Sequence, residues 1–337
     1  MKALFDKMLA ALHGGTPAVL CIIVASSGSV PRGAGAKMAV FPDGSIAGTI
    51  GGGTVEYLAI QRALAIHAGG ADAAERFVLR PNQVQDIGMV CGGEVTVHFR
   101  RFDLDDPEGI ALLEHLLSLV SRNCRGWLIM ALQDGRISDI GTWDDTDGMR
   151  FLHEPSEGDV LPHLCSRAVL LSGDPALYIE PVSRPGMVYI FGGGHVGQAL
   201  CPVLAGIDFR VTMVENRPAL RDVSRFPGAV QVLHDDCTDI RTTIPITSDD
   251  YVVIMTPGHA DDRGILDQVL WTPARYIGLI GSRKKLAATR AYLLERGHDE
   301  ASLSRIHSPI GLSIGAETPQ EIAISIAAEL IAERAGV

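Results

Sequence analysis

The sequence lacks the features of membrane, secreted and nucleic-acid-binding proteins. It has no run of about 18 apolar residues, and residues 1–15 are typical of an amphipathic helix rather than a signal peptide. The formal net charge is −11, and the only dense basic cluster is the short run 283–285. Binding to phosphate backbones or anionic lipids needs a clustered excess of Lys and Arg, so we expect neither nucleic acid nor membrane as a partner. A soluble cytoplasmic protein is the expectation.

The six cysteines have no C-x-x-C spacing, which argues against a zinc ribbon. A chain of 337 residues, 47% of them hydrophobic, can bury a core without a disulfide framework. Cys21 and Cys201 lie in apolar runs and are typical of buried thiols. Cys91 differs because it precedes two glycines in a loop, where open backbone amides would lower its pKa and make the thiolate a soft ligand or nucleophile. A structural, buried thiol is the alternative.

Glycine is concentrated between residues 25 and 56, next to clear strand patterns. The run 51–53 separates an apolar segment from a helical pattern, so backbone N–H groups should converge there at a helix N-terminus. Such a turn favours phosphate or carboxylate, because no Cβ blocks its approach and the helix dipole attracts negative charge. Arg32 and Glu56 are expected near this turn. For Glu56, a favourable place in the first helical turn is the alternative.

The two halves of the chain carry different secondary-structure patterns. Residues 1–182 mix helices with hairpins, whereas strands and helices alternate strictly through residues 187–337, after a linker at 183–186. Strict alternation indicates a doubly wound parallel sheet. We therefore predict an α/β protein, with an N-terminal mixed α/β domain and a C-terminal Rossmann-like nucleotide-binding domain. The expected strands are 18–25, 37–41, 45–50, 75–79, 95–99, 127–132, 136–143, 187–191, 210–215, 230–233, 251–255 and 276–280, and the expected helices are 3–12, 54–67, 107–122, 195–205, 261–270, 283–296 and 319–333; residues 148–180 show no clear pattern.

A second glycine loop opens the C-terminal half. Residues 192–197 read G-x-G-x-x-G between a strand and a helix, and Glu215 ends the next strand about 20 residues on, where an acidic side chain can bind a ribose 2′-hydroxyl. Arg217 leaves the choice between a 2′-hydroxyl and a 2′-phosphate open. His195 and His259 could polarise a bound ligand or could simply be solvated. The alternative for the glycines is close helix–strand packing alone.

Several segments, in order along the chain, closely resemble the XdhC/CoxI family, the accessory proteins of xanthine dehydrogenase and related molybdenum hydroxylases. The resemblance implies a non-catalytic chaperone that binds molybdenum cofactor (molybdopterin) and delivers it to the apo-hydroxylase. It also implies a cysteine desulfurase partner, which replaces an oxo ligand of molybdenum with sulfide while the cofactor is held. The family's characteristic thiol falls on Cys91, which would be the metal ligand or reactive group. The matching segments are 28–32, 48–56, 91–93, 192–197, 278–283, 310–312 and 318–321.

The two glycine turns would share the cofactor, the first taking its anionic end and the second its nucleotide part or a separate NAD(P). An NAD(P)-dependent oxidoreductase is one alternative, although no Tyr-x-x-x-Lys pair stands beside the fingerprint, and a nucleotide-sensing regulatory protein is another. The apolar helix 321–330, together with the resemblance, predicts a homodimer. The candidate cofactor-binding residues are Arg32, Gly51, Gly52, Gly53, Glu56, Cys91, Gly92, Gly93, Gly192, Gly194, His195, Gly197, Glu215 and His259.

Overall fold

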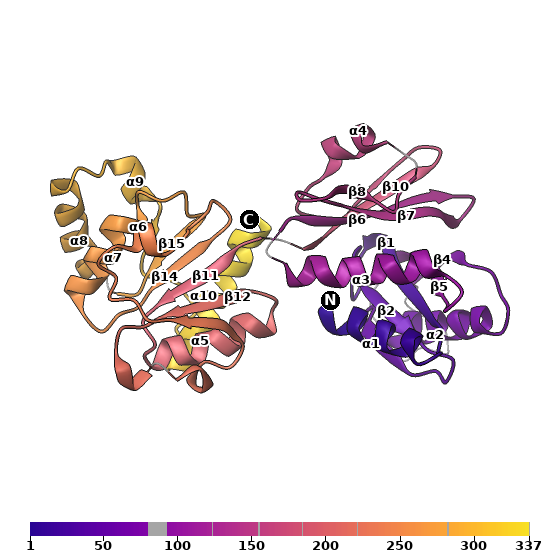
Figure 1. Cartoon of the computed structure of the whole chain (residues 1–337), viewed down its shortest axis with the longest axis horizontal. Helices are drawn as coiled ribbons and strands as arrows, with labels where there is room; N and C mark the ends of the chain where they lie inside the picture. The colour runs from indigo at the N-terminus through magenta and orange to yellow at the C-terminus, as the bar shows by residue number, and fades with distance from the viewer. Residues whose placement is uncertain are drawn as a thin grey trace. The chain divides into compact units, whose positions relative to one another are not determined.

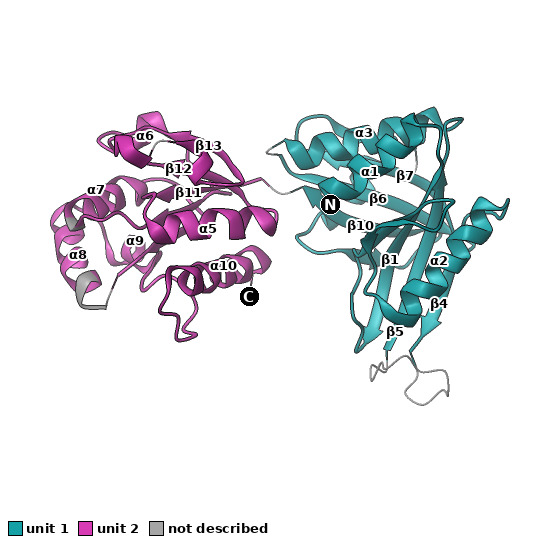
Figure 2. Ribbon diagram, turned by 90° about the horizontal axis from the view of Figure 1, so that it is seen from below, with its two compact units in different colours: residues 1–184 teal, residues 185–337 magenta. Residues whose placement is uncertain are grey.

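A computed structural model of the chain describes residues 1–79, 93–122, 124–153, 156–183, 185–220, 222–281 and 283–336. It divides into two compact units, Met1–Arg184 and Pro185–Val337 (Figure 2). The first unit combines helices with two antiparallel sheets, and the second has helices around one parallel sheet (Figure 1). The predicted fold class is therefore confirmed. Within the described residues, no helix combines the length and apolar character needed to cross a bilayer.

The first sheet is built around β1, whose residues 18–24 are apolar and buried. Helix α2 covers one face, where Val55, Ala59 and Ala63 pack against β1 and its neighbours. All strand pairs in this sheet are antiparallel, and the predicted hairpin at 37–50 is confirmed as β2 and β3. The strand order is β3 (Ile46–Thr49), β2 (Lys37–Val40), β1 (Ala18–Gly28), β5 (Gly93–Phe102) and β4 (Ala73–Val78), with α2 spanning Gly53–His67.

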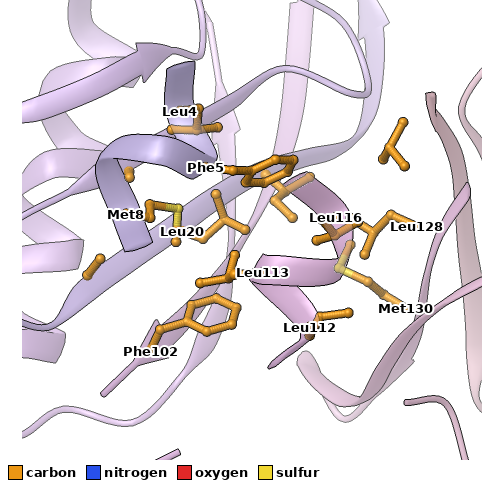
Figure 3. Packing of buried hydrophobic residues seen from close by; sticks show 14 of the residues in the cluster. Leu4, Phe5, Met8, Leu20, Phe102, Leu112, Leu113, Leu116, Leu128 and Met130 are labelled. Atoms are coloured by element: carbon orange, nitrogen blue, oxygen red, sulfur yellow. The ribbon is translucent and has the colours of Figure 1, made fainter. Parts of the chain in front are cut away.

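The second antiparallel sheet shares a hydrophobic core with helices α1 and α3, which lie side by side in both overall views (Figures 1 and 2). Figure 3 shows Phe5 and Met8 of α1 meeting Leu113 and Leu116 of α3, with Leu128 of the sheet close by. The strand order is β8 (Gly148–Arg150), β7 (Arg136–Asp144), β6 (Gly126–Gln133), β10 (Ala176–Ser183) and β9 (Val169–Leu171), and the helices are α1 (Lys2–His13), α3 (Pro107–Ser121) and α4 (Glu157–Val160).

The sheet of the second unit is parallel throughout, in the order β13-β12-β11-β14-β15-β16. Numbered from its first strand, this order is 3-2-1-4-5-6, that of a dinucleotide-binding fold. Helices α5 and α10 cover one face, and α7 and α8 cover the other. The bounds are β11 (Met187–Phe191), α5 (His195–Gly206), β12 (Arg210–Val214), β13 (Ala229–Leu233), α6 (Ile240–Thr243), β14 (Tyr251–Ile254), α7 (His259–Val269), β15 (Tyr276–Leu279), α8 (Arg283–Glu295), α9 (Glu300–Ser304), β16 (Ile306–His307) and α10 (Pro319–Ala335).

Helix α10 is fastened to the sheet by a polar network around Glu329, which makes the stability of the second unit depend on pH. Its carboxylate accepts hydrogen bonds from the Tyr276 hydroxyl (2.8 Å) and the Gly311 amide, and lies 3.1 Å from Nδ1 of His307. The hydrogen bond to Glu329 raises the pKa of His307 above its ordinary value, although burial opposes the shift. A raised pKa means that the protonated imidazole stabilises the fold, and that this contribution disappears as pH rises through the folded-state pKa.

We expect a His307→Gln variant to report this dependence. The wild type should be more stable than the variant below the ordinary histidine pKa of about 6.5, and the difference should shrink as pH rises through the raised folded-state pKa of His307. Thermal unfolding followed by circular dichroism at several pH values measures the difference. A gap between the two proteins that stays constant with pH would contradict the assigned role.

Candidate functional site

Two of the sequence motifs meet where β1 and β5 pair. Gly28, at the end of β1, is paired with Gly93, at the start of β5. A Cβ added to Gly93 would lie 2.6 Å from the carbonyl oxygens of Ser27 and Ser29, so only glycine fits at that position. Strand β5 therefore begins directly beside the 28–32 motif.

The glycine turn at residues 51–53 also packs against the 28–32 motif. A Cβ added to Gly51 would lie 2.9 Å from Cβ of Pro31 and 3.3 Å from the backbone nitrogen of Arg32. Gly51, Gly52 and Gly53 all have positive φ values, of 123°, 74° and 64°, which L side chains rarely adopt. The structure thus brings the predicted residues Arg32, 51–53 and Gly93 together at one end of the first sheet.

The carboxylate of Glu56 accepts hydrogen bonds from the glycine turn and holds it in place. Its Oε2 accepts hydrogen bonds from the Thr49 hydroxyl (2.5 Å) and from the backbone amides of Ile50 and Gly52 (both 3.2 Å). The amide of Gly51 donates to the Thr49 hydroxyl (3.0 Å). These amides are therefore already paired, and the carboxylate of Glu56 shapes the turn from within.

The backbone amides that remain free to bind an external anion are those in the first turn of α2. The backbone amides of residues 53–55, in the first turn of α2, have no hydrogen-bond acceptor in the part of the chain that the structure describes. The guanidinium of Arg32 is exposed and has no ion-pair partner among those same residues. Amides at a helix N-terminus and a guanidinium are both groups that bind anions, and the free amides begin at Gly53, the last glycine of the turn that the sequence indicated.

Replacing Glu56 should open this turn. We expect Glu56→Ala to lower the free energy of unfolding of the first unit by about 1–3 kcal/mol, because a charged acceptor of three hydrogen bonds is lost. Glu56→Gln keeps an acceptor oxygen in the same place and should lose clearly less. Urea denaturation of both variants measures the effect, and equal losses would mean that the acceptor does not hold the turn.

Cys91 and Gly92 lie outside the described residues, so the expected thiol chemistry stays a prediction. The described chain stops before this segment at Leu79, whose amide donates a hydrogen bond to the carbonyl oxygen of Gly93 (2.8 Å). The described residues therefore stop at Leu79 and resume at Gly93 at neighbouring positions, next to the start of the 28–32 motif.

One cluster of possible metal ligands occurs among the described residues, in the first unit. His115, Asp144 and Asp147 have ligand atoms within 4.8 Å of one another. However, a guanidinium nitrogen of Arg122 lies 3.6 Å from a carboxylate oxygen of Asp144, and one of Arg150 lies 3.5 Å from the His115 ring. These arginines already supply the positive charge that a cation would bring, so the cluster is an ion-pair network.

The glycines of the second loop have separate roles. The amide of Gly192 donates to the carbonyl oxygen of Val214 (3.0 Å), which ties the loop to β12. A Cβ added to Gly197 would lie 2.3 Å from the Gly192 carbonyl oxygen, so glycine is needed there for α5 to pack on the loop. A Cβ added to Gly194 would meet no described atom within 4 Å, so the backbone at this position is open to a ligand. Gly197 is therefore required for packing, whereas Gly194 leaves room for a ligand to approach the backbone.

Glu215 is placed at the end of β12 as predicted, but its carboxylate is fully engaged. It accepts hydrogen bonds from the Gly193 amide (2.7 Å) and from three nitrogens of Arg217, at 2.9, 2.8 and 2.7 Å. Burial raises the pKa of Glu215, but these hydrogen bonds outweigh it and lower the pKa overall. The ribose-binding role predicted for Glu215 therefore requires Arg217 to move aside.

A cavity of about 400 Å³ lies at the carboxyl ends of β11, β12 and β14, where the strand order reverses. Ligands of doubly wound sheets bind at this point. His195 is exposed at the start of α5, and His259 is the first residue of α7. The residues that line the cavity include some that the sequence did not single out: Asp236 and Cys237 after β13, Thr256 after β14, and Asp261 in the first turn of α7.

The chain is thus a two-unit protein that joins a Rossmann domain to an N-terminal unit with a glycine-rich turn at the start of α2. Two family models match it: the XdhC Rossmann domain over residues 188–330, and the XdhC and CoxI family over residues 11–80. Together they cover more than half of the chain, in the order found in the structure. The chain belongs to the XdhC and CoxI family.

Relatives extend this similarity over nearly the whole chain. It is 27% identical to a probable component of xanthine dehydrogenase from Bacillus subtilis, covering 98% of this chain and 97% of that protein. It is also 27% identical to "Uncharacterized protein YqeB" of Escherichia coli, over 94% of this chain but only 43% of the relative, so it spans less than half of that protein. A crystal structure described as a xanthine dehydrogenase from Bacillus halodurans has the same fold, with a TM-score of 0.83, 24% identity, and coverage of 98% of this chain and 96% of the other.

Proposed function

We propose that this protein is an accessory factor of xanthine dehydrogenase or a related molybdenum hydroxylase, which binds molybdenum cofactor as cargo and delivers it to the enzyme. The observation that carries the proposal is the meeting of the family's N-terminal motifs around free helix amides and Arg32. Family membership and the name of the Bacillus subtilis relative support the choice of enzyme.

The residues at this site fit the anionic end of a molybdopterin. The cofactor carries a phosphate, which the amides of residues 53–55 and the guanidinium of Arg32 can bind with charge-assisted hydrogen bonds. Main-chain donors hold an anion without a net positive surface, which is consistent with the chain's formal charge of −11. The proposed role thus requires no basic patch.

Cys91 is the proposed contact to molybdenum. It stands two residues before Gly93, which lies against the 28–32 motif. A thiolate is a soft ligand and suits a soft, oxidation-prone metal centre. We propose that it holds or protects the metal while a cysteine desulfurase exchanges an oxo ligand for sulfide, with the protein acting as a carrier rather than as the catalyst.

We also propose that the protein is a homodimer. Helix α10 exposes Ile324 (52%) and Ile331 (42%), two turns apart on the same face. Apolar side chains exposed in this way are typical of a surface that another copy covers. Light scattering that finds only monomers at micromolar concentration would contradict this assembly.

The cavity of the second unit favours a second ligand, which we propose to be NAD(P) or the nucleotide part of the cofactor. Its place at the switch point supports this choice. An NAD(P)-dependent oxidoreductase or a nucleotide-sensing regulator are the competing functions for the same cavity. Calorimetry separates them from the carrier: tight binding of a free dinucleotide by a protein that never carries pterin would favour the sensor, and turnover of NAD(P)H with carbonyl substrates would favour the oxidoreductase.

Delivery to the enzyme tests the proposed function. Protein purified from cells that make the cofactor is mixed with apo-xanthine dehydrogenase, and the recovered hydroxylase activity is measured. Arg32→Ala should reduce the recovered activity about tenfold or more, because charge-assisted bonds to phosphate are lost. Arg62→Ala, on α2, is the matched control and should behave as wild type, because this side chain is 40% exposed and makes only a 4.0 Å contact to Glu75. No recovery with the wild-type protein would refute delivery.

A further inference from the structure

A charged cluster is buried between the two sheets of the first unit. The ammonium group of Lys37, on β2, contacts the carboxylate of Glu180, on β10, and each side chain is only 3% exposed. Lys37 also donates to the carbonyl oxygen of Gly35 (3.1 Å), and the Tyr178 hydroxyl donates to Oε2 of Glu180 (2.9 Å). The cluster therefore joins the two sheets through charge rather than through hydrocarbon.

Stability alone gives no reason for charge at this position. Met38, Ala39 and Val40 follow Lys37 and are fully buried, as is Ile179 before Glu180. An ion pair in such surroundings gains little over well-packed apolar side chains, because both charges lose their hydration. Charged groups kept in a buried, costly position are candidates for ligand recognition.

A cavity of about 350 Å³ borders both Glu180 of this cluster and Arg32. Its walls include Arg32, Gly35, Ala168 and Glu180. A Cβ added to Gly35 would lie 3.2 Å from Oε2 of Glu180, and Gly35 has a φ of +97°. Glycine at this position leaves the backbone close to the carboxylate without a side chain to cover it from the cavity.

The carboxylate of Glu180 has acceptor capacity to spare. An ionised carboxylate accepts about four hydrogen bonds, and Lys37 and Tyr178 use two of them. Lys37 supplies the counter-charge, so a ligand needs to bring donors but no positive charge. A ligand edge with two neighbouring N–H groups matches this demand, as paired donors match a carboxylate in bidentate recognition.

We propose that this cavity binds the 2-amino-4-oxopyrimidine ring of a pterin, whose N3–H and 2-amino groups donate to Glu180. This inference rests on the proposed function and identifies the pterin ring as the part of the cargo that the cavity binds. Arg32 borders the cavity and also lies against Gly51 of the glycine turn. Arg32 and Gly35 are three positions apart in the sequence, a reach of at most about 10 Å, so the pterin ring and the phosphate of one molecule can occupy the two places together.

Two small pteridines test whether the N3–H and 2-amino groups are recognised. Full-length protein, purified from cells that cannot make molybdopterin, is titrated with pterin and with lumazine, which has an oxo group in place of the 2-amino group, and ligand fluorescence is followed. Pterin should bind about ten- to a hundredfold more tightly, because lumazine sets an acceptor against the carboxylate. Equal affinities would overturn the proposal. Guanosine carries the same donor edge on a purine, and its binding more tightly than pterin would assign the cavity to guanine instead.

Variants test whether Glu180 and the cavity are responsible. Ala168→Phe fills the cavity and keeps the charges of Lys37 and Glu180, and the double variant Lys37→Met with Glu180→Gln removes the charge as a pair. Both should lose the preference for pterin over lumazine, whereas Ala71→Phe, at an exposed position of the same unit, should keep it. If the double variant does not fold, Ala168→Phe decides. Unchanged pterin binding by the folded variants would overturn the assignment.

The cofactor content of the same proteins separates this inference from the proposed function. If the wild type and Ala168→Phe carry equal amounts of molybdopterin from producing cells, the cavity assignment is wrong and the carrier function stands. If the wild type carries none, yet distinguishes pterin from lumazine, the carrier function is wrong and the cavity assignment stands.

Discussion

Lys37→Met alone should cost the first unit about 3–5 kcal/mol of unfolding free energy, because it leaves a carboxylate buried without its counter-charge. Glu180, the partner that would remain, is 3% exposed and sits beside apolar strand residues. Urea denaturation of the full chain, followed by tryptophan fluorescence, measures the loss. Two of the three tryptophans, Trp127 and Trp143, lie on the second sheet, and a Trp271→Phe background removes the signal of the second unit.

The double variant provides the control for this experiment. Combining Lys37→Met with Glu180→Gln removes both charges, so the free energy of unfolding should recover most of the single-variant loss. The Tyr178 hydroxyl keeps an acceptor in the glutamine oxygen. A double variant as unstable as the single one would show that the loss comes from packing, and that the buried charge has no special cost here.

The second large effect concerns two glycines of the Rossmann loop that look equivalent in the sequence. Gly197→Ala should destabilise the second unit and abolish nucleotide binding, because its Cβ would lie 2.3 Å from the Gly192 carbonyl oxygen, where the backbone must shift. Gly194→Ala should leave the fold intact, since a Cβ there meets no described atom within 4 Å and the residue has an ordinary φ of −70°.

Nucleotide binding should also distinguish the role of Gly194 from that of Gly197. A methyl group at Gly194 stands where a phosphate would approach the backbone, so Gly194→Ala should weaken nucleotide binding without lowering the melting temperature. Calorimetry with NAD+ and NADP+, run beside thermal unfolding, measures both quantities. Equal melting temperatures for the two variants would contradict the packing role given to Gly197.

The second unit could be predicted closely from the sequence because its elements obey strong local rules. Each buried parallel strand is a short apolar run, and each helix begins at a glycine or a capping residue. The capping box at Thr318 and Glu321 is formed as expected and starts α10. Residues 148–180 could not be predicted, because the short strands and single-turn helix there are held by the neighbouring sheet rather than by their own pattern.

The places of the glycine turns could be predicted from the sequence, whereas the hydrogen bonds around them could not. Glycine positions are readable because positive φ and close approach demand that residue, and the motifs meet as their family order implies. The sequence could not show that Glu56 fills its own glycine turn or that Arg217 occupies Glu215, since side-chain pairing depends on the folded geometry. Lys37 and Glu180 lie far apart in the sequence, and only tertiary structure joins them.

We propose that the glycine-rich end of the first sheet holds molybdopterin, and the pterin content of the purified protein is the measurement that decides it. Protein from cofactor-producing cells is denatured and oxidised, and the released pterin is measured by fluorescence. The wild type should carry stoichiometric pterin, and both Arg32→Ala and Cys91→Ala should carry far less while remaining folded. A wild-type protein without pterin, or variants that carry as much as the wild type, would contradict the account.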